Sequence, residues 1–92
     1  MKNTAVVRHF GEESDPAKRL KQKWGEALRS QRETLGFTLD EVAERMKASG
    51  CHVSPQAIGM WERGETAPKW HNQMAVAQAL GTTRSVLFQD VA

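Results

Sequence analysis

Residues 38–64, TLDEVAERMKASGCHVSPQAIGMWERG, decide the fold, because they carry the start and stop signals of two consecutive short helices. Thr38 followed by Glu41 is a capping box, in which each side chain bonds the other residue's backbone amide. Ser54 followed by Pro55 is a cap with a proline at the first helical position. The pattern predicts two helices joined by a tight connection, with the second helix presenting its N-terminal end.

The flanking sequence continues the helical pattern on both sides. Asp15 and Pro16 form another helix start, and apolar residues then recur at three- and four-residue spacing along a stripe that ends at Leu35. A fourth helix is expected over residues 69–80 and a fifth after Thr83. We expect the fourth helix to bury four side chains, which are Trp70, Met74, Ala77 and Leu80.

No strand signal appears from residue 15 onward, and there are no internal repeats. The sequence therefore predicts an all-α domain of five helices over residues 15–92. Residues 1–14 show no sustained period, and we interpret them as a flexible N-terminal arm.

Composition limits the function classes. The chain has 92 residues, a net charge of +2 and one cysteine, Cys51, which suits a reducing cytoplasm. No segment is apolar and long enough to span a membrane, and the first residues lack a signal-peptide core, so we expect a cytoplasmic protein. Basic residues dominate residues 18–32 and acidic residues dominate residues 33–65, which favours one basic face.

Catalytic and metal-binding patterns are not found. No nucleophile motif or phosphate-binding glycine loop is present, and Cys51-His52 has no paired metal-ligand spacing. We therefore expect neither an enzyme nor a metal or other cofactor. The three tryptophans, Trp24, Trp61 and Trp70, fall on apolar stripes and are expected in the core.

Taken in order, these residues resemble the phage lambda repressor/Cro family of helix-turn-helix regulators, also called the XRE family. The residues that carry the resemblance are Leu28-Arg29, Arg32, Leu35-Gly36, Leu39, Glu41, Val42-Ala43, Val53-Ser54, Ile58, Trp61-Glu62-Arg63-Gly64, Pro68, Ala77 and Leu80-Gly81. The resemblance implies a five-helix fold whose third helix reads DNA bases. It also implies an ion pair between Arg32 and Glu62 that sets the angle of that helix.

If the third helix lies in the major groove, its exposed early positions are expected to read bases, and these are Gln56, Met60, Pro55 and Gly59. Gln56 is the strongest of them, because its amide matches the adenine edge. The side chains expected near phosphates are Ser54, Arg63, Lys69, Arg29 and Thr38.

The last helix is expected to complete the core with Leu87 and to leave Phe88 and Val91 for a homodimer that forms on DNA. Packing into the core of a monomer is the alternative for these two residues.

The function predicted from the sequence is a sequence-specific regulator of transcription that binds double-stranded DNA, and most simply a repressor. An antitoxin or protein-interaction adaptor, with a toxin or other protein as its partner, is the alternative.

Overall fold

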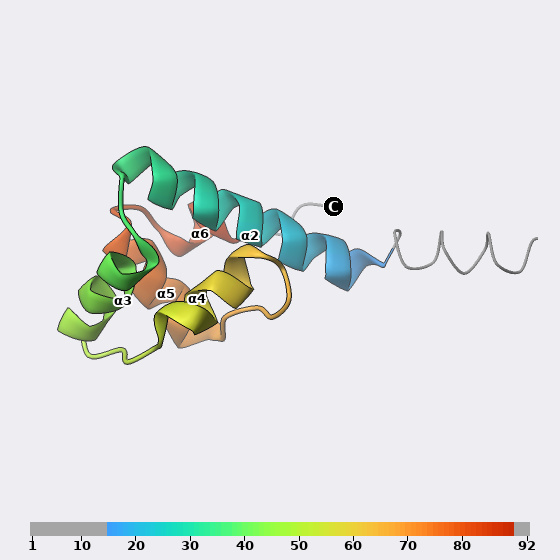
Figure 1. Cartoon of the computed structure of the whole chain (residues 1–92). Helices are drawn as coiled ribbons and strands as arrows, with labels where there is room; N and C mark the ends of the chain where they lie inside the picture. Colours follow the sequence, from blue (N-terminus) through green and yellow to red (C-terminus); the bar gives the residue numbers. More distant parts are fainter. Residues whose placement is uncertain (1–14, 90–92) are drawn as a thin grey trace, which may run out of the picture.

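The computed structural model describes residues 15–89, and in this range the chain forms five helices and no strand, as predicted (Figure 1). The helices are α2 (Pro16–Leu35), α3 (Leu39–Ala48), α4 (Pro55–Glu62), α5 (Trp70–Ala79) and α6 (Arg84–Leu87). Residues 1–14, predicted to be an arm, and Val91 lie outside the described residues. None of the described helices has the length and apolar character needed to cross a membrane.

Side-chain caps begin the first three helices, as the sequence predicts. The Asp15 carboxylate accepts from the Ala17 amide at 3.0 Å. At the start of α3 the full capping box forms, with Thr38 Oγ1 accepting from the Glu41 amide at 3.1 Å. These bonds satisfy backbone donors that a helix otherwise leaves unpaired, and each cap contributes about 1 kcal/mol.

The later helices differ in detail from the expectation. The helix predicted over residues 69–80 begins at Trp70 and ends at Ala79. α6 is a single turn of four residues, and Thr83 precedes it without a side-chain hydrogen bond to its backbone. Both differences lie at helix ends, where the local sequence constrains the backbone least.

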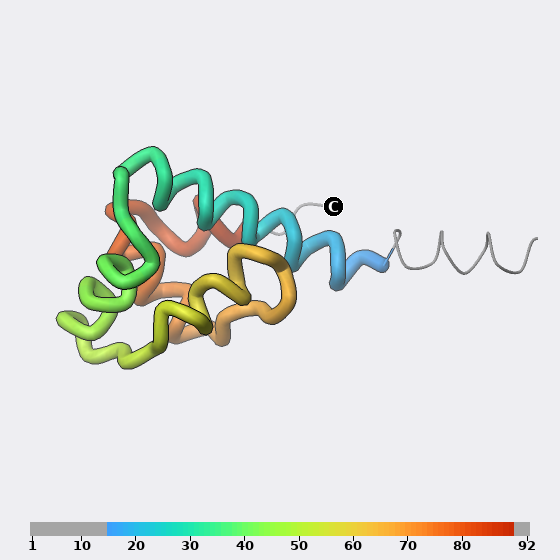
Figure 2. Tube along the Cα trace, viewed as in Figure 1, coloured from blue at the N-terminus to red at the C-terminus, as the bar shows by residue number. Residues whose placement is uncertain are grey.

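The core lies where α2, α3, α4 and α5 meet, and the largest side chains that are fully buried in it are Leu28, Met46, Ile58, Leu80, Val42 and Val76. The Cα trace shows α2 running along one side of the domain, with α4 and α6 beside it and α3 below its C-terminal end (Figure 2). Burial of each aliphatic side chain contributes roughly 1.5–3 kcal/mol, so this cluster supplies most of the stability.

α5 is turned differently from the prediction. Trp70 is 60% exposed and Met74 is 52% exposed, although both were expected in the core, whereas Ala77 and Leu80 are buried as predicted. The helix contains no Asp, Glu, Lys or Arg that would mark its exposed side, so its sequence does not say which side is buried. The buried side includes Gln73, whose amide donates to the Pro68 carbonyl at 2.9 Å.

The prediction that the buried apolar stripe of α2 extends to Leu35 is also wrong, since Leu35 is 43% exposed. It lies in the last turn of α2, immediately before Gly36, whose φ of 75° ends the helix. The chain leaves the helix at this point, and the core does not extend as far as Leu35.

α2 and the C-terminal end of α4 approach each other closely at Gly25. A Cβ atom added there would lie 2.5 Å from the carbonyl oxygens of both Trp61 and Glu62. These atoms belong to the backbone and cannot rotate away. Only glycine allows this approach, and it therefore determines how near α4 lies to α2.

We predict that Gly25→Ala destabilises the domain by about 2 kcal/mol or more, because the added methyl group must push α4 away from α2. Gly59→Ala is the matched control, since this second helical glycine would place its Cβ 3.3 Å from the movable end of the Arg63 side chain. There the gain in helix propensity should leave stability unchanged or slightly higher. Urea unfolding measures both, and equal effects of the two substitutions would contradict the role given to Gly25.

Candidate nucleic-acid interface

An open groove of about 640 Å³ lies between the start of α3 and the outer side of α4. Its lining residues are Arg32, Thr38, Leu39, Asp40, Pro55, Gln56, Gly59, Met60, Arg63 and Glu65. All four residues predicted to read bases line this one groove. Lys69, Arg29 and Ser54, predicted to contact phosphates, are not part of its lining.

The exposed side chains of α4 line the groove. Ser54 caps the helix, with Oγ accepting from the Ala57 amide at 3.1 Å. Gln56 is exposed, Pro55 is half-buried and Met60 is 36% exposed. The groove therefore presents one side-chain amide between two apolar contacts, and an amide of this kind can both donate to and accept from a base edge.

Gly59 does not take the exposed position expected of it, because it is buried. A Cβ on Gly59 would meet the Leu39 side chain at 3.5 Å and the end of the Arg63 side chain at 3.3 Å. These two side chains cover the backbone, so the prediction that Gly59 takes an exposed position on this helix is wrong.

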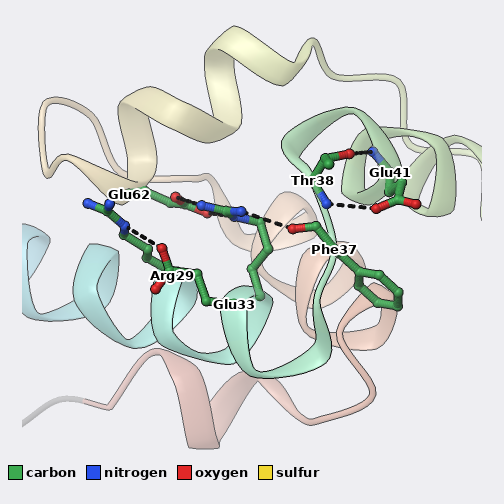
Figure 3. A network of polar contacts seen from close by, with 7 residues as sticks. Arg29, Glu33, Phe37, Thr38, Glu41 and Glu62 are labelled. Carbon is green, nitrogen blue, oxygen red and sulfur yellow. Dashed lines mark hydrogen bonds and ion pairs between the residues drawn. The ribbon is translucent and has the colours of Figure 1, made fainter.

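An ion pair joins α4 to α2. The Arg32 guanidinium donates to both oxygens of the Glu62 carboxylate, at 2.6 and 2.9 Å, and also to the Phe37 carbonyl at 2.9 Å. Figure 3 shows Glu62 reaching from α4 toward the side of α2, with Phe37 and Thr38 beyond it. The two side chains are only 15% and 6% exposed. The hydrogen bond to Glu62 is the main reason that the pKa of Arg32 is raised.

Arg63, which follows α4, is held by a carboxylate on the protein itself. Its Nε donates to Glu65 at 2.7 Å, and both side chains are more than half exposed. The hydrogen bond raises the pKa of Arg63 and lowers the pKa of Glu65. Because solvent surrounds the pair, it is weak and Arg63 can exchange Glu65 for another anion.

Two other residues predicted to contact phosphate, Arg29 and Thr38, have partners of their own. Arg29 donates to Glu33 at 3.0 Å on the exposed side of α2 (Figure 3). Thr38 uses its hydroxyl for the capping box, and the first turn of α3 carries two acids, Asp40 and Glu41, which repel phosphate. Lys69 is exposed and precedes α5.

The expected dimer surface is wrong at Phe88, which is 3% exposed. Its ring meets Trp24 edge to face, with centroids 5.5 Å apart. The Trp24 indole N–H donates to the Gln89 carbonyl at 2.8 Å, which draws the end of the described chain onto α2. Leu87 is buried as expected, and the exposed apolar residue of α6 is Val86.

Sequence reasoning missed several residues of the site. Leu39, Asp40 and Glu65 all line the groove, and the acids offset the positive charge of Arg63. Glu65 lies two positions after Arg63, and this close spacing of opposite charges could have predicted their ion pair. Gly25 lies inside a helical stripe, where an isolated glycine indicates close packing.

The chain matches a family described as "DISARM protein DrmE, C-terminal domain" over residues 4–89. The chain belongs to this family. No curated protein matches the chain. No solved structure matches it either.

Membership in the DrmE C-terminal domain family corrects the resemblance to the lambda repressor/Cro (XRE) family. The residues that carried that resemblance are caps, helix-ending glycines and the Arg32–Glu62 pair. Such residues determine where helices begin and end and how they pack, and unrelated helical domains use them in the same way. They predicted the five helices correctly but assigned the family wrongly.

We predict that Arg32→Met destabilises the domain by about 3 kcal/mol, because it leaves the Glu62 carboxylate buried without its cation. Glu62→Met should cost a similar amount. The double variant should lose clearly less stability than the two single variants lose together, since it removes both charges at once. Urea unfolding of the four proteins gives the coupling energy, and strictly additive losses would rule out a buried pair that holds α4.

Proposed function

We propose that this DrmE C-terminal domain binds double-stranded DNA with the exposed side of α4. The observation that carries the proposal is the placement of Gln56 and Met60 on the open groove. The helix that bears them is anchored at its other end by the Arg32–Glu62 pair. A helix that is fixed at its base and exposed along one side fits the major groove of DNA.

Each groove residue has a role in this proposal. Gln56 pairs through its amide with N7 and the N6 amino group of adenine, and Met60 contacts a thymine methyl group. Pro55 lies beside Gln56 at the start of the helix and adds a second apolar contact. Arg63 leaves Glu65 and binds a phosphate.

The attraction to phosphates must come partly from outside the groove. Its lining balances two cations, Arg32 and Arg63, against two acids, Asp40 and Glu65. The first half of α2, however, carries four basic residues and no acid between Pro16 and Gly25. In Figure 1 the beginning of α2 extends beyond the other helices, so the charges there are free to follow a nucleic-acid backbone.

The proposal is limited to binding. The family description names neither a repressor nor an operator. We therefore propose no regulated promoter, and we propose no dimer through Phe88, because that ring fills the core.

We predict that the full chain binds a short duplex of random sequence, with an affinity that falls steeply as salt rises. Arg63→Gln should reduce the slope of log affinity against log salt by about 1, because one phosphate contact is lost. Gln56→Ala should instead remove discrimination between adenine and other bases at one position. Fluorescence anisotropy measures both effects.

Val86→Ser is the control, because it removes an exposed apolar side chain from α6 and not from the groove. It should bind DNA as the unmodified chain does. DNA affinity that is independent of salt, or that survives the double variant Gln56→Ala/Arg63→Gln unchanged, would overturn the proposal.

We predict that Glu65→Gln strengthens DNA binding, by several-fold at low salt, because Arg63 no longer leaves a carboxylate in order to reach a phosphate. The same reasoning gives a pH dependence. In the free domain Arg63 lowers the pKa of Glu65. On DNA that carboxylate loses Arg63 and faces phosphate, so its pKa rises and binding takes up a proton.

Affinity should therefore increase as the pH falls toward the ordinary range of glutamate, and Glu65→Gln should remove that increase. Anisotropy titrations across the acidic range measure it. An unchanged pH dependence in Glu65→Gln would show that Arg63 does not leave Glu65 on binding DNA.

A further inference from the structure

The exposed side of α5 is a second surface, separate from the groove beside α4. Trp70 and Met74 are more than half exposed there, one helical turn apart. α5 contains no Asp, Glu, Lys or Arg, although exposed helix sides in small domains normally carry charge. An exposed helix side that carries no charge and presents two large apolar side chains is typical of a surface that a partner covers.

A groove of about 640 Å³ runs along this side, between α5, the connection after α3 and the start of α6. Met74, Ala75 and Arg84 are among its lining residues. None of its lining residues is an acid. The groove is of the size that takes one or a few apolar side chains.

Arg84 is held in place by a chain of polar contacts. The Gln73 amide donates to the Pro68 carbonyl at 2.9 Å, and the Gln73 side-chain oxygen accepts from Arg84 Nε at 2.7 Å. The guanidinium then lies over the Trp70 ring, 3.8 Å from its centre. The arginine is fixed before any partner arrives, which lowers the entropic cost of binding.

The charge of Arg84 is not matched within the described residues. In residues 15–89, Arg29, Arg32 and Arg63 each pair with a carboxylate, whereas Arg19, Arg45 and Arg84 do not. Gln73 uses only Nε, and the two terminal nitrogens donate no hydrogen bond to residues 15–89. A carboxylate is the acceptor that matches two parallel guanidinium donors.

We propose that this side of α5 binds a polypeptide segment in which an apolar side chain is followed or preceded closely by a carboxylate. The apolar side chain fills the groove over Met74 and Ala75, and the carboxylate pairs with the terminal nitrogens of Arg84. Nucleic acid fits this surface less well. Besides His71, Arg84 is the one basic residue in the groove lining, and it already covers one side of the Trp70 ring.

The test begins with selection of binders from a random peptide library on the immobilised full chain. Enriched peptides should share an apolar residue near Asp or Glu. A synthetic peptide of that consensus is then titrated into protein labelled with ¹³C on the methionine methyl groups. The Met74 methyl signal should move on peptide addition, and the Met60 signal should not, because Met60 lies on the groove beside α4.

Three variants test the contacts. Met74→Ser and Arg84→Gln should each weaken peptide binding by about tenfold or more, as truncations at the centre of an interface do. Arg84→Lys keeps the charge and should lose less. Val86→Ser is the control for an exposed apolar residue elsewhere, and should bind normally. Thermal unfolding verifies that each variant is folded.

Four results would overturn the proposal. They are the absence of enriched peptides, binding that Met74→Ser leaves unchanged, movement of the Met74 signal on adding duplex DNA, and self-association of the chain that Met74→Ser abolishes. The last two would assign the surface to DNA or to a second copy. Failure of duplex DNA to move the Met60 signal would instead count against the DNA-binding proposal, so the two tests fail independently.

Discussion

The junction between α2 and the C-terminal end of α4 is the constraint on which the rest of the structure depends. Gly25 lets the α4 backbone approach α2 to a distance that no other residue would allow. Arg32 then binds Glu62 with two hydrogen bonds and the Phe37 carbonyl with a third, so one guanidinium joins α2, α4 and the connection that leads into α3. Backbone packing sets the distance between the helices, and the ion pair sets the register.

This junction explains why α4 can be both short and exposed. A helix of eight residues is not stable alone, and one side of α4 gains little from burial because it lines the groove. Its stability comes from the burial of Ile58 and Trp61 in the core, from the Ser54 cap at one end and from the ion pair with α2 at the other. The side chains in between are therefore presented in fixed positions, which reduces the cost of ordering them on a ligand.

The domain has two exposed surfaces of different chemistry. The groove beside α4 combines an amide, a thioether and weakly paired charges, and it suits a polar partner with base edges and phosphates. The outer side of α5 presents Trp70 and Met74 beside one fixed arginine, and it suits a protein segment. Since Gln73 is buried within α5, the same helix contributes to the core and also positions Arg84 at its surface.

Local signals predicted the fold well, and tertiary contacts explain what they missed. Asp15, Thr38 and Ser54 cap helices through bonds to amides two or three residues away, so the sequence alone contains the whole interaction. The orientation of α5 depends on which side meets the core, and a sequence that has no Asp, Glu, Lys or Arg and has polar residues on both sides gives no preference. Phe88 is buried because Trp24, distant in sequence, meets its ring. Gly59 is covered because Arg63 and Leu39 fold over it, which no spacing rule predicts.

Native-state hydrogen exchange of the α4 amides tests most directly whether α4 is held by α2. We expect the amides of Gly59 to Glu62 to exchange with the same opening free energy as those at the centre of α2, around Leu28, because the two helices open together. A markedly lower opening free energy for α4, with α2 still protected, would show that α4 opens alone and is not held by α2.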